Sequence, residues 1–579
     1  MSAEQFIQQK AAAAIQAIYG TEVAETSLQV SVTRKEFEGD YTLVTFPLLK
    51  ITHQAPDATG NAIGQWLVDN VPEISAFNSV KGFLNLSFSP VYWNESLQAM
   101  AADDNFGQLP DTAKRIMVEF SSPNTNKPLH LGHIRNNLLG DSVSRILKAC
   151  GNTVIKSTIV NDRGVHICKS MYAWEKKFDG ATPESTGKKG DHLVGDCYVA
   201  YAQMEKEHPE IIDEVHKMLV DWEAGDPHVR ELWAMMNGWV YAGFDETYAA
   251  LGITFDQVDH ESETYLLGKE LVQKGLAEGV FVKDPDGSVW CDLTADGLDR
   301  KLVLRGDGTS VYITQDLGTA ERRFANFNLD SHVYVVGNEQ DYHFQVLKLI
   351  LKKLGFDWAD QIYHLSYGMV ELPEGKMKSR EGTVVDADDL IQSMYEEAKK
   401  TSEESGKLAD LSDEEKEELY HMIGLGALKY FIIKVDPKKT MLFNPKESID
   451  FNGNTGPFIQ YTHARIRSIL RKAAEQGIAF GPADVTTDLI PSGKEIRLVK
   501  LLGLFPGKVG EAVAALSPAV IANYAYDLAK EFNQYYHDTP ILREEDPKLL
   551  AFRLELIDVL ARTLRRAMGI LGIQLPERM

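Results

Sequence analysis

The chain has 579 residues, of which 44% are hydrophobic and 25% charged, and its 60 basic and 84 acidic side chains give a formal net charge of −24. One hydrophobic core rarely grows beyond about 250–300 residues, so this length predicts about three to four domains. The excess of acidic side chains excludes a surface that is basic throughout for nucleic-acid binding, but it allows a local basic patch.

The first 110 residues predict a small domain that mixes helices and strands. Residues 1–20 predict an amphipathic helix and not a signal peptide, because polar residues recur throughout this stretch. Residues 41–51 and 82–90 are strand-like, and the polar, acidic stretch 101–115 predicts a linker to the next domain.

A parallel sheet is predicted to begin after this linker. Residues 115–122 form an apolar strand, a helix is expected from about His133 to Ala149, and residues 152–164 predict the next strand. A strand, a helix and a strand in this order form a right-handed crossover unit, which is the building block of a parallel sheet. We therefore expect a Rossmann-like α/β catalytic domain over residues 111–450.

Two further regions complete the predicted architecture. Residues 165–250 are helical and heavily charged and are followed by short strand-like stretches, so we place an insertion in the α/β domain at about 165–300. From about residue 410 the pattern predicts almost only helices. The first long amphipathic one is predicted over residues 456–477. The expected fold is thus a Rossmann-like α/β domain with an insertion, a small α+β N-terminal domain, and an all-α C-terminal domain over 451–579.

The composition also favours a cytoplasmic protein. No stretch approaches about 18 consecutive apolar residues, so we expect no membrane association. The cysteines lie far apart and form no C-x-x-C pair, which argues against a disulfide framework or a cysteine zinc site and favours a reducing compartment. They are Cys150, Cys168, Cys197 and Cys291.

The turn after the first strand of the sheet carries the motif H-x-G-H, formed by His130, Gly132 and His133. Ligands of open parallel sheets bind at the carboxyl ends of strands, where helix N-termini lie. Gly132 permits a close approach that a side chain would block, and the imidazoles can donate hydrogen bonds to phosphoryl oxygens. Taken alone, the motif also fits a chance turn, while a metal site lacks a third ligand at helical spacing.

A second basic motif lies between Gly375 and Gly382. Lys376, Lys378 and Arg380 in this stretch could clamp a polyphosphate, or could form a solvated basic loop. The occurrence of H-x-G-H and K-M-x-S in this order is much less expected by chance than either motif alone.

The two motifs resemble those of a known family. Residues 118–141 (VEFSSPNTNKPLHLGHIRNNLLGD) and 376–385 (KMKSREGTVV) are similar to the two ATP motifs of class I aminoacyl-tRNA synthetases, and in particular of arginyl-tRNA synthetases. Strings along nearly the whole chain share the resemblance, among them VNDRG, LRGDGTSVYITQDLGTA, VVGNEQDYHFQVL and the terminal LPERM. The resemblance implies that arginine attacks the α-phosphate of Mg-ATP to give arginyl-adenylate and pyrophosphate, and that the terminal adenosine of tRNA(Arg) then accepts the arginyl group.

The resemblance also implies the roles of individual residues. The catalytic groups are His130, His133, Lys127, Lys376 and Lys378. ATP is contacted by His130, His133, Lys127 and Lys376 together with Gly132, Gly337, His343, Met369, Val370, Met377, Ser379 and Arg380, and arginine is contacted by Glu119, Ser121, Asn124, Glu261, Tyr312, Asp316 and Gln340.

The chemistry of the substrate agrees with these assignments. A guanidinium group presents five donors in a plane and is best matched by carboxylates and a phenol. Tyr312 and Asp316 are spaced i, i+4 and supply both groups on one side if this stretch is helical, and Glu261 is a second acidic partner. Asn124 and Gln340 are expected on the charged α-groups of the amino acid. No structural metal is expected.

One position departs from the family pattern. The fourth place of the second motif usually holds a lysine, and here it holds Ser379. Arginyl enzymes with such a loop typically carry a lysine just before the first motif, and Lys127 stands at that place. Our hypothesis is that Lys127 takes over part of the pyrophosphate clamp, whereas the simpler alternative is a lysine at a helix entry.

A tRNA-binding surface is expected on the helical C-terminal domain. The helix over 456–477 carries Arg465, Arg467, Arg471 and Lys472 beside the aromatic residues Phe458 and Tyr461. Unpaired loop bases stack on aromatic rings while phosphates pair with arginine, so Tyr461, Arg465 and Arg467 are candidate tRNA contacts. Aromatic residues at this spacing are also common in helical cores, as are those of the segment 524–536. The resemblance implies an anticodon-binding role for this domain, a grip on the tRNA elbow by residues 1–110, and a monomeric protein.

Two other functions remain open from the sequence. Small adenylyltransferases also use H-x-G-H at a strand–helix turn, but they are short and lack the helical C-terminal region. A synthetase-like binding protein that has lost catalysis would not be expected to keep both histidines, the basic loop and the acidic residues.

Overall fold

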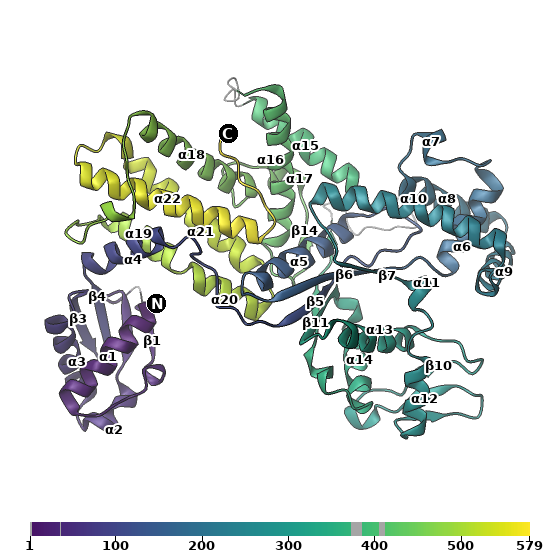
Figure 1. Ribbon diagram of the computed structural model, residues 1–579, viewed down its shortest axis with the longest axis horizontal. Coiled ribbons are helices and arrows are strands. Elements are labelled where there is room, and N and C mark those ends of the chain that lie inside the picture. The colour runs from purple at the N-terminus through teal and green to yellow at the C-terminus, as the bar shows by residue number, and fades with distance from the viewer. Residues whose placement is uncertain (1–2, 35, 372–384, 405–410) are drawn as a thin grey trace.

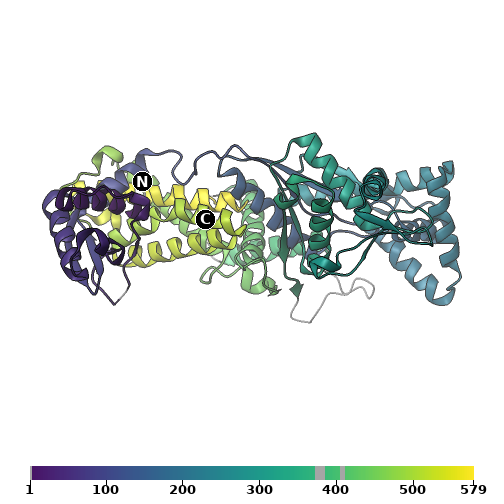
Figure 2. The same cartoon turned by 90° about the horizontal axis from the view of Figure 1, so that it is seen from below.

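The computed structural model describes residues 3–34, 36–371, 385–404 and 411–579. The molecule is elongated, with the N-terminal domain at one end and the helical insertion of the catalytic domain at the other (Figures 1 and 2). The parallel sheet and the C-terminal helices lie between them.

The N-terminal domain is a four-stranded antiparallel sheet in the order β1-β2-β4-β3, with α1 and α3 packed together beside it. The strand predicted over 41–51 is shorter than expected, because the chain turns into the short helix α2 after Val44. α4 leaves this domain and packs against two C-terminal helices, α19 (Gly493–Gly503) and α22 (Pro547–Ile570). The elements are α1 (Ala3–Tyr19), β1 (Val30–Val32), β2 (Tyr41–Val44), α2 (Leu49–Thr52), α3 (Pro56–Asn70), β3 (Ile74–Val80), β4 (Phe83–Phe88) and α4 (Pro90–Ala102).

The catalytic domain is built on a five-stranded sheet in the order β12-β11-β5-β6-β7, and all neighbouring strands in it are parallel. The predicted crossover unit is present as β5, α5 and β6, although α5 begins at Leu131 and not at His133. Its elements are β5 (Arg115–Glu119), α5 (Leu131–Lys148), β6 (Thr153–Val160), β7 (Gln257–His260), β11 (Ser331–Gly337), α14 (Asp341–Lys353) and β12 (Ile362–Tyr367).

The two faces of this sheet are covered by different helices. Ile116 and Val118 of β5 belong to the core that includes α5, whereas Met117 between them belongs to the core that includes α14. Because β5 continues into α5 on one face and its neighbour β11 into α14 on the other, the sheet has a topological switch point between these strands. Open parallel sheets bind their ligands at the carboxyl ends of the strands beside such a point.

The insertion differs in length from the prediction. The helices α6–α10 lie between β6 and β7, but β7 joins the main sheet, so the expectation of one insertion over about 165–300 is wrong in this respect. β7 has only four residues, and two of them have charged or amide side chains. This explains why the sequence pattern does not predict a strand here. The helices are α6 (Val165–Lys177), α7 (Pro183–Thr186), α8 (Gly190–Glu207), α9 (Ile211–Ala224) and α10 (Pro227–Leu251).

A smaller antiparallel sheet in the order β10-β9-β8 follows β7 in the chain. The next helix, α13, packs against the same face of the main sheet as α14. These elements are α11 (Glu261–Thr264), α12 (Lys269–Ala277), β8 (Phe281–Lys283), β9 (Val289–Cys291), β10 (Lys301–Leu304) and α13 (Tyr312–Phe327).

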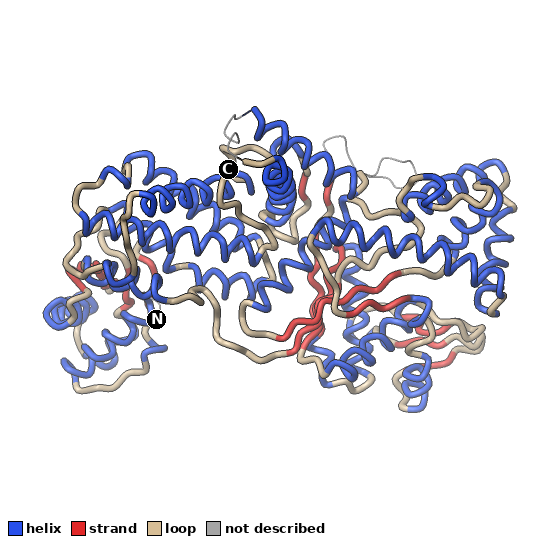
Figure 3. Tube along the Cα trace, turned by 45° about the horizontal axis from the view of Figure 1, so that its top comes forward, coloured by secondary structure: helices blue, strands red, loops and turns tan. Residues whose placement is uncertain are grey.

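The C-terminal domain is helical, as Figure 3 shows. A pair of two-residue parallel strands, β13 and β14, joins it to the catalytic domain, and α16 packs on both α5 and α18. The elements after β12 are β13 (Val370–Glu371), α15 (Ala387–Glu404), α16 (Asp413–Ile433), β14 (Met441–Leu442), α17 (Pro445–Ser448), α18 (Gly456–Glu475), α19 (Gly493–Gly503), α20 (Phe505–Ala515), α21 (Ala519–Asp538) and α22 (Pro547–Ile570), of which α18–α22 lie in the C-terminal region expected over 451–579. No helix in the described part of the chain is both long and apolar enough to cross a bilayer.

Candidate active site

The H-x-G-H motif forms the start of α5. His130 is the N-cap residue, and its Nδ1 accepts a hydrogen bond from the backbone N–H of Gly132 at 3.1 Å. His133 Nδ1 accepts one from the backbone N–H of His130 at 3.2 Å. A ring nitrogen that accepts a hydrogen bond carries no proton, so each neutral imidazole must carry its proton on Nε2. The motif therefore presents two Nε2–H donors.

Both imidazoles are held in the neutral form. Burial, assisted by Lys127, lowers the pKa of His130 to about 4, although Asp386 acts in the opposite direction. Burial together with His130 and Lys127 lowers the pKa of His133 well below its usual value. These pKa shifts also show that Lys127 lies close enough to both rings to affect their charge. A neutral donor pair can bind a phosphate without exchanging protons with it.

A helix N-terminus can bind an anion through free backbone N–H groups, but the first N–H groups of α5 are already used within the protein. The N–H of Leu131 is already bonded to the carbonyl oxygen of Val385 at 3.0 Å, and that of Gly132 to His130. A Cβ atom on Gly132 would lie 3.0 Å from the His130 ring, so the glycine is needed for the position of this ring. The imidazole groups are thus the main donors at this end of the helix.

A cavity of about 750 Å³ lies beside His130, between the first motif and the insertion. Asn124 and Lys127 line it together with His130, so the structure brings these three predicted residues together. Burial lowers the pKa of Lys127. The other lining residues come from α6, from the start of α8 and from the chain before and within α15; among them are His166, Lys189, His192 and Asp386.

The second motif falls outside the described residues. Lys376, Met377, Lys378, Ser379 and Arg380 all lie within 372–384. The chain on its C-terminal side is described and returns directly to the first motif, where Val385 and Ala387 bond with Leu131 and Leu129 on either side of His130, each at 3.0 Å.

Glu119 ends β5 and is paired within the protein. It forms an ion pair with Arg323, and Arg323 Nη2 also lies 2.7 Å from Asp259 Oδ2. Burial acts against the charge of Arg323, but Glu119 and Asp259 raise the pKa of its guanidinium above the usual value. One partner of Glu119 is thus a side chain of α13, and its contact with arginine stays a prediction.

The acidic pair predicted to bind arginine consists of Glu261, which begins α11 directly after the edge strand β7, and Asp316, which lies on α13. Burial, with the nearby charges of Asp162 and Asp316, raises the pKa of Glu261 to about 7, although Arg163 opposes this shift. One carboxylate oxygen of Asp316 lies 2.6 Å from Nε2 of His343, which connects a predicted arginine contact with a predicted nucleotide contact. Burial disfavours the charged form of the Glu261 carboxyl, and a bound cation would favour it, so Glu261 is suited to a cationic ligand.

The remaining predicted arginine contacts lie in different surroundings. Ser121 is buried in a left-handed conformation (φ 73°), and its hydroxyl lies 2.7 Å from that of Tyr248. Tyr312 does begin a helix together with Asp316, but its side chain is 78% exposed. Gln340 is exposed in a single turn after β11, next to the buried Gly337.

Met369 and Val370 lie at the start of β13. The carbonyl oxygen of Met369 accepts a hydrogen bond from Met441 at 3.0 Å, so it is used in the strand pairing. Backbone groups of successive strand residues point in opposite directions, which directs those of Val370 away from β14. Val370 is therefore the better placed of the two for a backbone contact with a base.

The basic surface of the C-terminal domain is partly open. A cavity of about 950 Å³ between α18 and α21 is lined by Tyr461, Arg465, Arg471, Lys472, Tyr536, Arg543 and Arg578, among others. The guanidinium of Arg465 lies 4.7 Å from the ring centre of Tyr461. Arg467 is outside this cavity and pairs with Glu577 at 2.7 Å. Of the aromatic candidates in 524–536, Tyr524 and Tyr535 are core residues.

Sequence reasoning missed several residues that support the site. Asp162 accepts hydrogen bonds from Tyr241 and from both the backbone and the hydroxyl of Ser262, at 2.7–2.8 Å, and so fixes the start of the segment that bears Glu261. Asp162 lies in the string VNDRG, which predicts the end of a strand and carries part of the resemblance, but no pattern in it marks this aspartate as a support of the site. No sequence pattern indicates the role of Arg323, because its partner Glu119 is 204 residues away.

Comparison with known proteins agrees with this architecture. Residues 96–444 match the family described as tRNA synthetases class I (R), catalytic domain, and residues 459–579 match the DALR anticodon binding domain. The chain is 56% identical to the arginine–tRNA ligase of Bacteroides thetaiotaomicron over 584 residues, which cover 98% of each chain. It is 54% identical to that of Porphyromonas gingivalis over the full length of both.

Solved structures give the same result. The arginyl-tRNA synthetase of Thermus thermophilus superposes with a TM-score of 0.81 at 26% identity over all of both chains. The fold of the enzyme from Plasmodium falciparum is also similar, with a TM-score of 0.76 at 20% identity over 100% of this chain and 99% of that one. The match of the catalytic family over more than half of the chain, together with full-length identity above 50%, shows that the chain belongs to the arginyl-tRNA synthetase family.

Proposed function

We propose that the protein ligates L-arginine to tRNA(Arg) in two steps, through arginyl-adenylate, with Mg-ATP as substrate. The main support is the pair of neutral histidine donors with Lys127 at the start of α5, beside the switch point, together with the carboxylates of Glu261 at the start of α11 and Asp316 on α13. The test is charging of tRNA(Arg) with radiolabelled amino acids. We expect charging with arginine alone, and charging only with another amino acid would reject the proposal.

In the first step the carboxylate of arginine attacks the α-phosphorus of ATP and pyrophosphate leaves. Negative charge grows on the phosphoryl oxygens, and the Nε2–H groups of His130 and His133 are the donors that can stabilise it. Lys127 adds a positive charge beside them. The protein needs no covalent intermediate, because positioning and charge stabilisation are sufficient for this displacement. We place the ATP near Gly132, Gly337 and the backbone of Val370.

Arginine is recognised by the acidic pair. Glu261 and Asp316 offer carboxylates to the planar guanidinium, and each charge-assisted hydrogen bond contributes roughly 1.5–3 kcal/mol. A lysine ligand could carry the same charge, but it could not bond to both carboxylates with one planar group. Carboxylate oxygens would then be left without a hydrogen bond in a partly buried site, and this is the basis on which the site rejects lysine.

Arginine affinity should therefore depend on pH. Since the pKa of Glu261 is raised to about 7 in the free protein and a bound guanidinium favours its charged form, affinity is full above about pH 7. It falls as pH drops below this value, by up to about tenfold per unit. Calorimetric titration of arginine at a series of pH values checks this, with Glu261→Gln as the control, whose affinity should be weaker and independent of pH around 7. An unchanged dissociation constant of the wild-type protein across this range would contradict the role of Glu261.

We propose that tRNA contacts two parts of the chain besides the active site. The cationic and aromatic cavity between α18 and α21 supports binding of the anticodon loop, with Tyr461 and Arg465 as contacts and Arg467 as a support for the C-terminal residues. The N-terminal domain lies at the end of the molecule opposite the insertion (Figure 1), and it is the part that we propose grips the elbow of the tRNA. Since one chain contains all three parts, we infer that a monomer is the active form, and we propose that it acts in the cytoplasm.

A further inference from the structure

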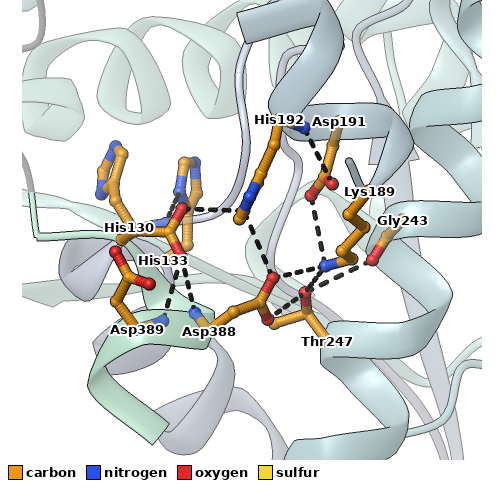
Figure 4. A network of polar contacts seen from close by, with 10 residues as sticks. His130, His133, Lys189, Asp191, His192, Gly243, Thr247, Asp388 and Asp389 are labelled. Atoms are coloured by element: carbon orange, nitrogen blue, oxygen red, sulfur yellow. Dashed lines mark hydrogen bonds and ion pairs between the residues drawn. The ribbon is translucent and has the colours of Figure 1, made fainter. Parts of the chain in front are cut away.

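A network of charged side chains connects the insertion to the chain that follows the second motif (Figure 4). Lys189 and His192 come from the start of α8, and Asp386 and Asp388 from the start of α15. Thr247 of α10 completes the network. Lys189 and Asp388 are 199 residues apart in sequence, so the network is created by the tertiary fold alone.

The contacts are short and converge on two cations. Lys189 Nζ lies 2.6 Å from Asp388 Oδ2 and 2.6 Å from the hydroxyl of Thr247, which in turn donates to Asp388 Oδ1 at 2.8 Å. His192 Nε2 lies 3.1 Å from Asp386 and 3.4 Å from Asp388. The two nearby carboxylates raise the pKa of His192 to about 10, so it is charged at neutral pH.

The network does not need a metal ion to hold it together. In the described part of the chain, Asp191, His192 and Asp388 have potential ligand atoms within 4.8 Å of one another. The ammonium group of Lys189 already lies 2.6 Å from Asp388 and 3.4 Å from the fully buried Asp191. A divalent cation would have to displace this ammonium group.

Asp386 connects this network to the active site. The main chain at Asp386 forms an antiparallel bridge with His130. Its carboxylate caps α15 by accepting from the N–H groups of Asp388 and Asp389, at 2.8 and 3.2 Å. The position of the segment facing His130 is thus determined by the first turn of α15, and this turn is held by α8 and α10.

We propose that Lys189 and His192 are positioning residues for adenylate formation, because they hold the first turn of α15 and thereby fix residues 385–387 against His130. This inference rests on the proposed arginylation function. It also means that a displacement of the insertion helices is transmitted to the segment beside the catalytic histidine.

The test is Lys189→Met, assayed by tRNA-dependent pyrophosphate exchange with arginine. We expect kcat to fall roughly 10- to 100-fold, the cost of a small displacement of catalytic groups, while the dissociation constant for arginine, measured by calorimetry, is unchanged. Lys189→Arg should restore part of kcat. The control is Lys217→Met, which removes an exposed lysine paired with Asp221 on α9 of the same insertion, and its activity should equal that of the wild type.

Two further variants separate a positioning role from a merely structural one. Thr247→Val keeps the side-chain shape but removes the shared hydroxyl, and it should lower kcat in the same direction even if Lys189→Met does not fold. Asp388→Asn combined with Lys189→Met should be no worse than the single variants, because they act as one unit. Wild-type kcat in both Lys189→Met and Thr247→Val would overturn the inference. A wild-type protein that charges no arginine would instead reject the proposed function.

Discussion

Replacing Lys127 by alanine should lower the rate of adenylate formation by about 10²–10³-fold, which is the usual cost of removing one group that stabilises developing charge. The structure gives the reason, since Lys127 lines the cavity beside His130 and its charge lowers the pKa of both motif histidines. Single-turnover measurement of arginyl-adenylate formation in the presence of tRNA(Arg) gives the rate.

The arginine site should be unaffected by this change, so the dissociation constant for arginine should equal that of the wild type. A matched control is Lys148→Ala, which removes an exposed lysine from the opposite end of α5. If Lys127→Ala forms adenylate at the wild-type rate, Lys127 is an ordinary lysine before a helix and the clamp role is wrong.

Replacing Asp316 by asparagine should weaken arginine binding by roughly 100-fold, equivalent to about 3 kcal/mol. The substitution keeps the size of the side chain but removes the charge proposed to bind the guanidinium, on a carboxylate that also lies 2.6 Å from Nε2 of His343. Calorimetric titration with arginine measures the effect directly, without dependence on the later steps.

The control for Asp316→Asn is Asp360→Asn, an exposed carboxylate of the same domain that pairs with Lys352 at 2.7 Å. Its arginine affinity should not change. Equal affinities in the Asp316 variant and the wild type would place the guanidinium elsewhere.

Much of the fold was predictable because local patterns and tertiary structure agree. The strand over 115–122 and the helix after it carry clear periodicity, and the glycine and histidines between them have the spacing that a strand–helix turn requires. The four-residue strand β7 could not be predicted, since QVDH has neither the length nor the alternation of a half-buried strand. Its pairing with β6 is a property of the assembled sheet.

The candidate site was predictable only where sequence neighbours form it. His130, Gly132 and His133 lie within one turn, and their mutual hydrogen bonds follow from that spacing. Glu119 was expected to bind the substrate, but the structure pairs it with Arg323 from a distant helix, and no local pattern specifies such a partner. Lys189 and Asp388 were missed for the same reason. A buried ion pair depends on the fold that desolvates it.

The most direct test of the account is the structure of the protein with a non-hydrolysable analogue of arginyl-adenylate. We predict that the guanidinium of the analogue lies within hydrogen-bonding distance of Glu261 and Asp316, and that its phosphate analogue accepts from Nε2 of His130 or His133. An analogue bound with its guanidinium away from both carboxylates, or with its phosphate analogue out of reach of both histidines, would contradict it.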